Sequence, residues 1–416
     1  MRVLMAVHQI PPEVGGVGLF SVHLCRAMAR AGHQVTLLAG SEERVDGSPE
    51  VTEVEAAAPG VRTLSLRRPR RRGGFLADLV DPAVDAVLKR TMDAEAPDVL
   101  HIQHTVGLSP RLAATGRAAG AAVVASVHDY WPICQRIDLR RPDGEQCDGP
   151  AGGVRCASCM PGERAHGLLA GLRRRAVGGA RLAPYVLRTQ LVQGAYAGAH
   201  RITCPSPATA RLLSTAGFPA DHVVVVDYGI PPLTGVASVP RPGRPFRVGY
   251  LGTLGPHKGV GVALRALGQS PAAGWQLHVH GGPLRDERLR GELEAAGDLA
   301  TYHGPYVEHH LPGLLAELDA VVIPSLWRET GPMVWMEALS AGVPVIASRL
   351  GALAERVRHG EDGLLFEPGD PGALAAAVEQ CMARYDHLRQ GVMQRTVRTV
   401  EDAAGELLAL YSELVG

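Results

Sequence analysis

Residues 2–39, RVLMAVHQIPPEVGGVGLFSVHLCRAMARAGHQVTLLA, decide the fold. The apolar residues 2–7 predict a short buried strand, and residues 19–31 carry apolar side chains near helical spacing. Gly32 suits the position just after a helix, and residues 34–39 predict a second buried strand. A strand, a helix and a strand in this order form a βαβ unit, so we expect a parallel sheet.

The same alternation returns in the second half of the chain. Between the halves, residues 230–245 are rich in Pro and Gly and lack periodicity, which indicates a linker. We therefore expect an α/β protein of two Rossmann-like, doubly wound domains that face each other across a cleft. The N-terminal domain is expected at 1–229, the C-terminal domain at 246–395, and a C-terminal helix that can pack back on the N-terminal domain at 396–416. Further elements are expected as strands at 98–102, 122–127, 247–252, 275–280, 319–324 and 343–347, and as helices at 260–267 and 332–341.

The composition fits a folded protein. The chain has 416 residues, 46% of them hydrophobic, and its 42 Lys and Arg residues balance 42 Asp and Glu residues. These values exclude global disorder and argue against a general nucleic-acid binder. No apolar run approaches the roughly 20 residues of a membrane span, and residues 1–8 lack the features of a signal peptide, so we expect a cytoplasmic protein. Only Lys89 and Lys258 are lysines, which makes each of them informative.

The segment 324–345, PSLWRETGPMVWMEALSAGVPV, carries two glutamates eight residues apart. A strand is expected to end at its start, and a helix to begin near Pro332 and to stop at Gly342. The free N–H groups at such a helix start suit an anion such as pyrophosphate. Glu329 can then reach a sugar hydroxyl and Glu337 a ribose diol; the alternative is a pair of solvated surface carboxylates.

Two glycine-rich loops follow expected strands. In residues 249–260, GYLGTLGPHKGV, a strand turns through glycines and presents Lys258 just before a helix, where an ammonium can neutralise a diphosphate leaving group. In residues 11–18, PPEVGGVG, glycines allow a close backbone approach to a ligand, although tight turns need glycine for their own sake.

Histidines stand at the ends of two further strands. His128 lies in residues 126–131, SVHDYW, at the carboxyl end of a strand, where ligands bind in such sheets. His101 and His104 end a neighbouring strand, and they either line a pocket or fill structural positions.

Four of the seven cysteines fall close together, as Cys134, Cys147, Cys156 and Cys159. The final C-x-x-C is a good metal knuckle, and four thiolates suit a structural zinc ion, although the other spacings fit no standard finger. Disulfides and free thiols are the alternatives.

The chain resembles the family 4 retaining glycosyltransferases of GT-B fold. The resemblance rests on the two glutamates with seven residues between them, on residues 338–348, ALSAGVPVIAS, and on residues 360–370, GEDGLLFEPGD. It implies that Glu337 binds the nucleotide ribose and that Glu329 acts near the donor sugar.

The resemblance also assigns the remaining candidates. Lys258 and His128 join Glu329 as catalytic candidates, with Lys258 on the diphosphate and His128 against the donor sugar. Thr253 stands where the family usually has an arginine of the phosphate clamp, so Lys258 becomes the main cation. The other donor-binding candidates are Gly16, Gly331, Pro332, Met333 and Val334, and the acceptor-binding candidates are His104, Asp129 and Tyr130.

The expected function is transfer of a sugar from a nucleotide-diphosphate sugar to an acceptor hydroxyl, with retention of configuration. A UDP-sugar is the favoured donor, the acceptor is a small molecule or lipid-linked, and the pathway is expected to be natural-product or glycoconjugate biosynthesis. No cofactor is expected at the reaction centre, no nucleic-acid partner is expected, and two arginine runs, 67–72 and 173–175, allow at most peripheral membrane contact. The alternatives are a sugar-nucleotide epimerase or hydrolase on the same scaffold, and a non-catalytic sugar-binding subunit.

Overall fold

The computed structural model describes residues 1–11, 16–69, 79–160, 178–233, 243–269 and 274–416. The chain divides into two compact units. Unit 1 comprises Met1–Asp227 and Val400–Gly416, and unit 2 comprises Tyr228–Thr399. Most of the expected linker, residues 234–242, lies outside the described residues.

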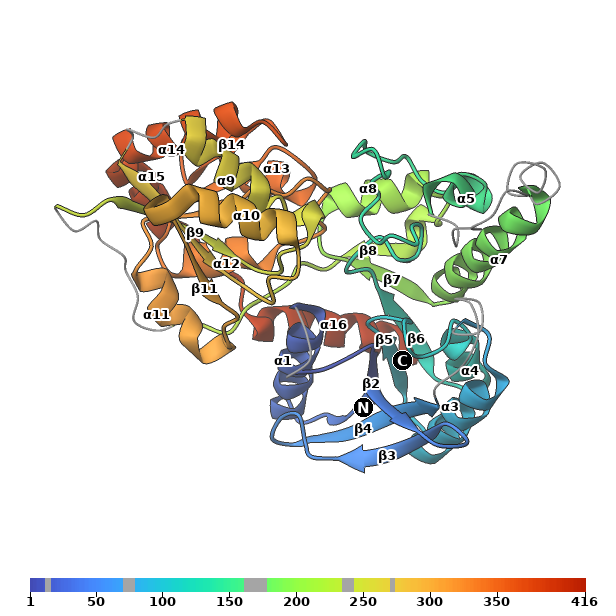
Figure 1. Cartoon of the computed structure of the whole chain (residues 1–416). Coiled ribbons are helices and arrows are strands. Elements are labelled where there is room, and N and C mark those ends of the chain that lie inside the picture. The colour runs from blue at the N-terminus through green and yellow to red at the C-terminus, as the bar shows by residue number, and fades with distance from the viewer. Residues whose placement is uncertain (12–15, 70–78, 161–177, 234–242, 270–273) are drawn as a thin grey trace. The chain divides into compact units, whose positions relative to one another are not determined.

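Unit 1 is built on an eight-stranded sheet in the order β3-β4-β2-β1-β5-β6-β7-β8 (Figure 1). All neighbouring strands are parallel except β3, which runs antiparallel to β4. The strands are β1 (Arg2–Val7), β2 (Gln34–Val45), β3 (Glu50–Val54), β4 (Val61–Pro69), β5 (Val99–Ile102), β6 (Ala122–Ser126), β7 (Arg201–Cys204) and β8 (Val223–Val225).

The α-helices described in unit 1 are α1 (Gly16–Arg30), α3 (Pro82–Glu95), α4 (Leu112–Ala118), α5 (Cys156–Cys159), α7 (Gly178–Ala197), α8 (Pro207–Thr215) and α16 (Val400–Val415). The C-terminal helix α16 is part of this unit because its fully buried Tyr411 hydrogen-bonds to His101 of β5. The core of unit 1 therefore includes the end of the chain.

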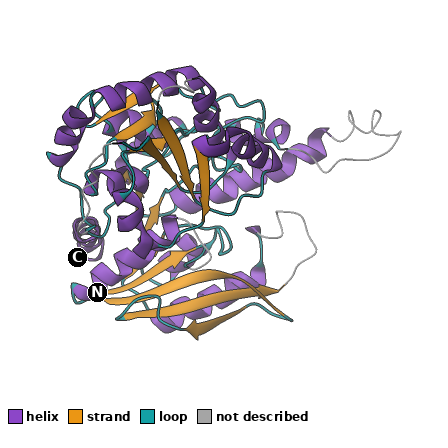
Figure 2. Ribbon diagram, turned by 60° about the vertical axis from the view of Figure 1, so that its left-hand side comes forward, coloured by secondary structure: helices purple, strands orange, loops and turns teal. Residues whose placement is uncertain are grey.

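Unit 2 contains a six-stranded, fully parallel sheet in the order β11-β10-β9-β12-β13-β14. Figure 2 shows its strands lying among helices. The strands are β9 (Phe246–Leu251), β10 (Trp275–His280), β11 (Ala300–Gly304), β12 (Ala320–Ile323), β13 (Val345–Ser348) and β14 (Gly363–Phe366). The helices are α9 (Val260–Gln269), α10 (Glu287–Ala296), α11 (Leu311–Ala316), α12 (Met333–Ser340), α13 (Ala352–Arg356), α14 (Pro371–Ala383) and α15 (Tyr385–Met393).

Both sheets reverse their strand order once, and this places the candidate site. In unit 1 the chain moves from β1 out to β2 and later returns to β5 on the other side of β1. In unit 2 the equivalent reversal lies between β9 and β12. The carboxyl ends of the strands at such a reversal form a crevice in which ligands bind.

The local sequence explains why the loops of unit 2 come so close together. Strands β12, β13 and β14 are buried along their whole length, as expected for a sheet covered on both faces. Gly259 has a φ of +75°, and a Cβ there would lie 1.9 Å from the carbonyl oxygen of Pro324. Only glycine therefore allows the loop after β9 to approach the loop after β12.

The elements that we expected around the candidate residues are confirmed, with ends that shift by a few residues. Strand β2 continues to Val45, beyond the expected end at residue 39. Helix α12 begins at Met333 because Pro332 takes the extended conformation of an N-cap. Among the described residues, no helix has both the length and the apolar character needed to span a membrane.

Candidate functional site

Lys258 and Glu329 come together at the strand reversal of unit 2. Lys258 ends a short 3-10 turn, Pro256–Lys258, after β9, and Glu329 lies in the loop between β12 and α12. Their Nζ and Oε1 atoms lie 2.9 Å apart. The Lys258 side chain is 27% exposed and the Glu329 side chain 5%, so the ammonium can reach a ligand from a buried anchor.

The Glu329 carboxylate is held by three donors, all on the same oxygen, Oε1. Besides Lys258, Ser325 donates from its hydroxyl at 2.6 Å and Trp327 from its indole N–H at 2.8 Å. Burial alone would raise the pKa of Glu329, but the Lys258 charge and these hydrogen bonds hold it below its ordinary value. Glu329 is therefore a buried, charged carboxylate at neutral pH.

Glu337 has different surroundings. It lies inside α12, where burial, together with the negative charge of Glu308, raises its pKa to about 7. Tyr306 is also close enough that Glu337 contributes to the raised pKa of its hydroxyl. Among the described residues, no hydrogen bond or ion pair joins Glu337 to Lys258 or Glu329, so the three predicted side chains form one pair and one separate carboxylate.

The other donor-side candidates surround α12 and β9. Gly331 is buried, Pro332, Met333 and Val334 are half-buried at the start of α12, and Thr253 is exposed. In unit 1, Gly16 is exposed and is the first residue of α1. The glycine before it, Gly15, lies outside the described residues.

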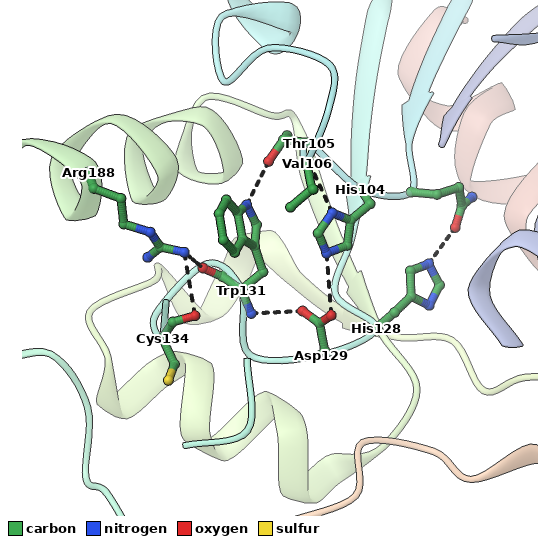
Figure 3. Close-up of polar contacts among 9 residues, drawn as sticks. His104, Thr105, Val106, His128, Asp129, Trp131, Cys134 and Arg188 are labelled. Atoms are coloured by element: carbon green, nitrogen blue, oxygen red, sulfur yellow. Dashed lines mark hydrogen bonds and ion pairs between the residues drawn. The ribbon is translucent and has the colours of Figure 1, made fainter. Parts of the chain in front are cut away.

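A second polar group follows β5 and β6 in unit 1 (Figure 3). The ring of His104 and the carboxylate of Asp129 are hydrogen-bonded at 3.3 Å, and Asp129 also accepts the backbone N–H of Trp131 at 2.8 Å. Burial acts to raise the pKa of Asp129, but the His104 charge and both hydrogen bonds hold it below its ordinary value. The structure thus brings two of the predicted acceptor-binding residues into contact.

His128 lies beside this group and is neutral. Its Nε2 faces the side-chain carbonyl of Gln103, so the proton lies on Nε2 and the lone pair on Nδ1 (Figure 3). Burial, followed by the neighbouring His104 charge, lowers the pKa of His128 to about 3. His128 therefore cannot act as a cation at neutral pH.

Two residues that end or follow these strands take structural positions. The predicted acceptor residue Tyr130 is 0% exposed and lies in the core of unit 1, and its role in acceptor binding stays a prediction. His101 is equally buried and is hydrogen-bonded to Ser126 at 2.7 Å and to Tyr411. The sequence pattern, which placed them at or after the end of a strand, did not distinguish them from His104 and His128.

The sequence reasoning missed some side chains that complete the two groups. His8 follows β1, with its ring centroid 4.8 Å from that of His104, and its pKa is lowered to about 4, chiefly by burial. Gln103 fixes His128, and Ser325 and Trp327 fix Glu329. His8 and Gln103 could have been found, because both directly follow expected strands; Trp327 stands in the quoted motif but its orientation gives no sequence signal.

The four clustered cysteines line one cavity of about 310 Å³, between Ile133 and Met160. They are not bonded in pairs, and burial raises the pKa of Cys134 to about 11. Over the described residues, no group of three or more His, Cys, Asp or Glu side chains is arranged to hold a metal ion. The zinc expectation for Cys134, Cys147, Cys156 and Cys159 is therefore not supported, and none of the four forms a disulfide.

The first arginine run is partly engaged in ion pairs. Arg67 pairs with Glu43 at 3.0 Å, and the buried Arg68 lies 3.8 Å from Asp81. Residues 70–72 and 173–175 lie outside the described residues.

Comparisons with known proteins show which family the chain belongs to. The family model "Glycosyltransferase Family 4" matches residues 14–232, and the model "Glycosyl transferases group 1" matches residues 245–384. Glycogen synthase of Mycobacterium tuberculosis is 28% identical over 388 residues, which cover 92% of this chain and 86% of that protein.

Two solved structures show the same fold. Sucrose-phosphate synthase from Thermosynechococcus elongatus superposes with a TM-score of 0.72 at 20% identity, covering 100% of this chain and 99% of that one. Anabaena Alr3699/HepE, in complex with UDP and glucose, superposes with a TM-score of 0.65 at 18% identity and 99% coverage of both chains. The family model over residues 14–232 covers more than half of the 416 residues. The chain belongs to glycosyltransferase family 4, the retaining GT-B enzymes that transfer a sugar from a nucleotide-sugar donor.

Proposed function

We propose that unit 2 binds the diphosphate and ribose of a UDP-sugar and that unit 1 presents an acceptor hydroxyl. The observation that carries this proposal is the 2.9 Å pair of Lys258 and Glu329 at the strand reversal of unit 2. A fixed ammonium at this position stabilises the negative charge that develops on the departing diphosphate. UDP is favoured because Alr3699/HepE, of the same fold, is solved with UDP and glucose.

Different residues of unit 2 contact different parts of the donor. Lys258 contacts the diphosphate together with the free backbone N–H groups at the start of α12, beginning at Met333. The three hydrogen bonds to Glu329 fall on Oε1, so Oε2 serves as acceptor for a hydroxyl group of the sugar. Glu337, which is separate from this pair, accepts the ribose hydroxyls.

Retention of configuration follows if the acceptor hydroxyl attacks the face from which the diphosphate departs. The bond from the anomeric carbon to the diphosphate oxygen breaks, the bond to the acceptor oxygen forms, and the acceptor proton passes to the diphosphate. The neutral His128 lies against the donor sugar. The contacting pair His104 and Asp129 holds the acceptor, a small polar molecule or a lipid-linked sugar in natural-product or glycoconjugate biosynthesis.

We place this reaction in the cytoplasm, with membrane contact that is at most peripheral. None of the seven cysteines, all of which lie in the described residues, forms a disulfide, as expected for a reducing compartment. Membrane contact is limited to a peripheral one because Arg67 and Arg68, of the first arginine run, are already engaged in ion pairs.

A thermal-shift panel tests the donor assignment. UDP-, GDP-, ADP- and dTDP-glucose are added to the full chain, and the cognate donor raises the melting temperature because it binds the native state. We expect the largest shift with UDP-glucose and its loss in Glu337→Ala. A larger shift with another nucleotide would overturn the choice of UDP, and no shift with any nucleotide sugar would overturn the donor site.

A further inference from the structure

We propose that Trp327 is a positioning residue that sets the orientation of Lys258 through two simultaneous contacts. This inference rests on the proposed function, because Lys258 is taken to bind the diphosphate. No motif in the sequence assigns a role to Trp327, which is 5% exposed in the loop after β12.

The two contacts of Trp327 act on opposite charges of the same ion pair. Its indole N–H donates to Oε1 of Glu329 at 2.8 Å, and its ring face lies 4.8 Å from Nζ of Lys258. A cation over an aromatic face is attracted by the electron-rich ring, and more strongly where water is excluded. The indole therefore holds the carboxylate with its edge and the ammonium with its face.

The loop that carries Trp327 is itself fixed to the loop that carries Lys258. The backbone N–H of Leu326 donates to the carbonyl of His257 at 2.8 Å, and the rings of His257 and Trp327 meet edge to face at 5.5 Å. Ser325, next to Leu326, donates to the same oxygen of Glu329 as Trp327 does. Both loops are thus joined before any ligand binds.

The contacts with Trp327 and Glu329 lower the entropy that Lys258 loses when it binds a ligand. Its side chain has four rotatable carbons and no planar group, so an unrestrained ammonium loses much rotamer freedom when it binds a phosphate. Because Trp327 and Glu329 restrict Lys258 in advance, part of that loss is removed from the binding step. The departure at Thr253 makes this restriction more important, since Lys258 is the cation that the proposed clamp relies on.

Selective labelling tests the position of Lys258 directly, because the chain has only two lysines. Lysine labelled with ¹³C at Cε gives two methylene signals in the full-length protein, and Lys89→Arg assigns them. Ring currents of Trp327 shift the Lys258 signal upfield of the signal of Lys89, which is exposed on α3. The expected result is partial loss of this shift in Trp327→Phe and complete loss in Trp327→Leu.

Binding of UDP supplies the functional measurement. Trp327→Phe keeps a ring under the ammonium but removes the N–H donor, and we expect UDP to bind about tenfold more weakly by calorimetry. The matched control is Trp275→Phe, in the core of the same unit, where the indole nitrogen is buried without a hydrogen-bond partner among the described residues. It should change neither the Lys258 signal nor UDP affinity.

The outcomes separate the two proposals. A Lys258 signal that coincides with that of Lys89, or unchanged UDP affinity in both Trp327 variants, would overturn the positioning role. Unchanged UDP affinity in Lys258→Ala would overturn the proposed donor site itself. If Trp327→Leu does not fold, the milder Trp327→Phe still decides the question.

Discussion

The ammonium of Lys258 and the carboxylate of Glu329 meet at 2.9 Å although 71 residues separate them in the chain. The pair joins two loops that follow neighbouring strands, β9 and β12, at the strand reversal of unit 2. Because Glu329 is buried and charged, the ion pair holds the two loops together in addition to its proposed role in donor binding. Its removal should therefore affect both activity and stability.

Lys258→Ala should lower the turnover of UDP-glucose about 10²–10³-fold, because it removes the charge that stabilises the departing diphosphate. Release of UDP measures this loss. Lys89→Ala is a matched control, since Lys89 is the other lysine and pairs with Asp93 on the exposed face of α3. Equal activity of the two variants would show that the ammonium at 258 has no role in turnover.

The C-terminal helix gives a prediction about stability. Tyr411→Phe removes the hydroxyl that hydrogen-bonds to His101, and both residues are fully buried. Leaving a buried polar atom unpaired costs about 1–3 kcal/mol, so the free energy of unfolding of unit 1 should fall by that amount. Urea denaturation measures it, with Tyr302→Phe in unit 2 as the control. An unchanged unfolding curve for Tyr411→Phe would mean that α16 adds nothing to unit 1 through this contact.

Sequence reasoning reached the strands, the two-part α/β architecture and the glutamate–lysine motif because each depends on local pattern. Apolar runs in the sequence predict buried strands, and the carboxyl ends of parallel strands must meet at one edge of the sheet. The same reasoning could not separate His101 from His104, since both end the same strand and only packing decides which one points into the core. It also could not see that Trp327 faces Lys258, because that contact depends on the rotamers of side chains from distant loops.

The cysteine cluster shows the same limit of local pattern. Their closeness in the sequence predicted that Cys134, Cys147, Cys156 and Cys159 lie near one another, and all four line one cavity. Spacing does not fix the directions of the thiols, and metal binding requires those directions to converge within bond length.

The pair of His104 and Asp129 yields a prediction with a defined pH dependence. The pKa of Asp129 lies below its ordinary value of 3.8, so the folded state gains stability from the carboxylate above that pH and loses it as the pH falls through the lowered pKa. Asp129→Asn should therefore lower the melting temperature at pH 7, and the difference from the wild type should shrink as the pH falls below about 4. Asp221→Asn, at an exposed position, is the control. A difference that stays constant with pH would contradict a charged Asp129.

Glu337 predicts a pH effect of the opposite sign. Its pKa of about 7 in the folded protein exceeds its ordinary value of 4.5, so between these values the folded state binds more protons than the unfolded state. The contribution of Glu337 to stability is therefore largest below pH 4.5 and is lost as the pH rises through 7. Glu337→Gln removes this loss and should raise the melting temperature at pH 8 by about 2–4 °C.

The same substitution should weaken the donor site, because the charged carboxylate accepts the ribose hydroxyls. Wild-type affinity for UDP should rise as the pH increases from 6 to 8, whereas Glu337→Gln should bind weakly and with little pH dependence over that range. Calorimetric titration with UDP measures both trends, and Glu317→Gln, whose carboxylate pairs with Arg247 elsewhere in unit 2, is the control. If Glu337→Gln is more stable at pH 8 but binds UDP as tightly as the wild type, the ribose does not contact Glu337.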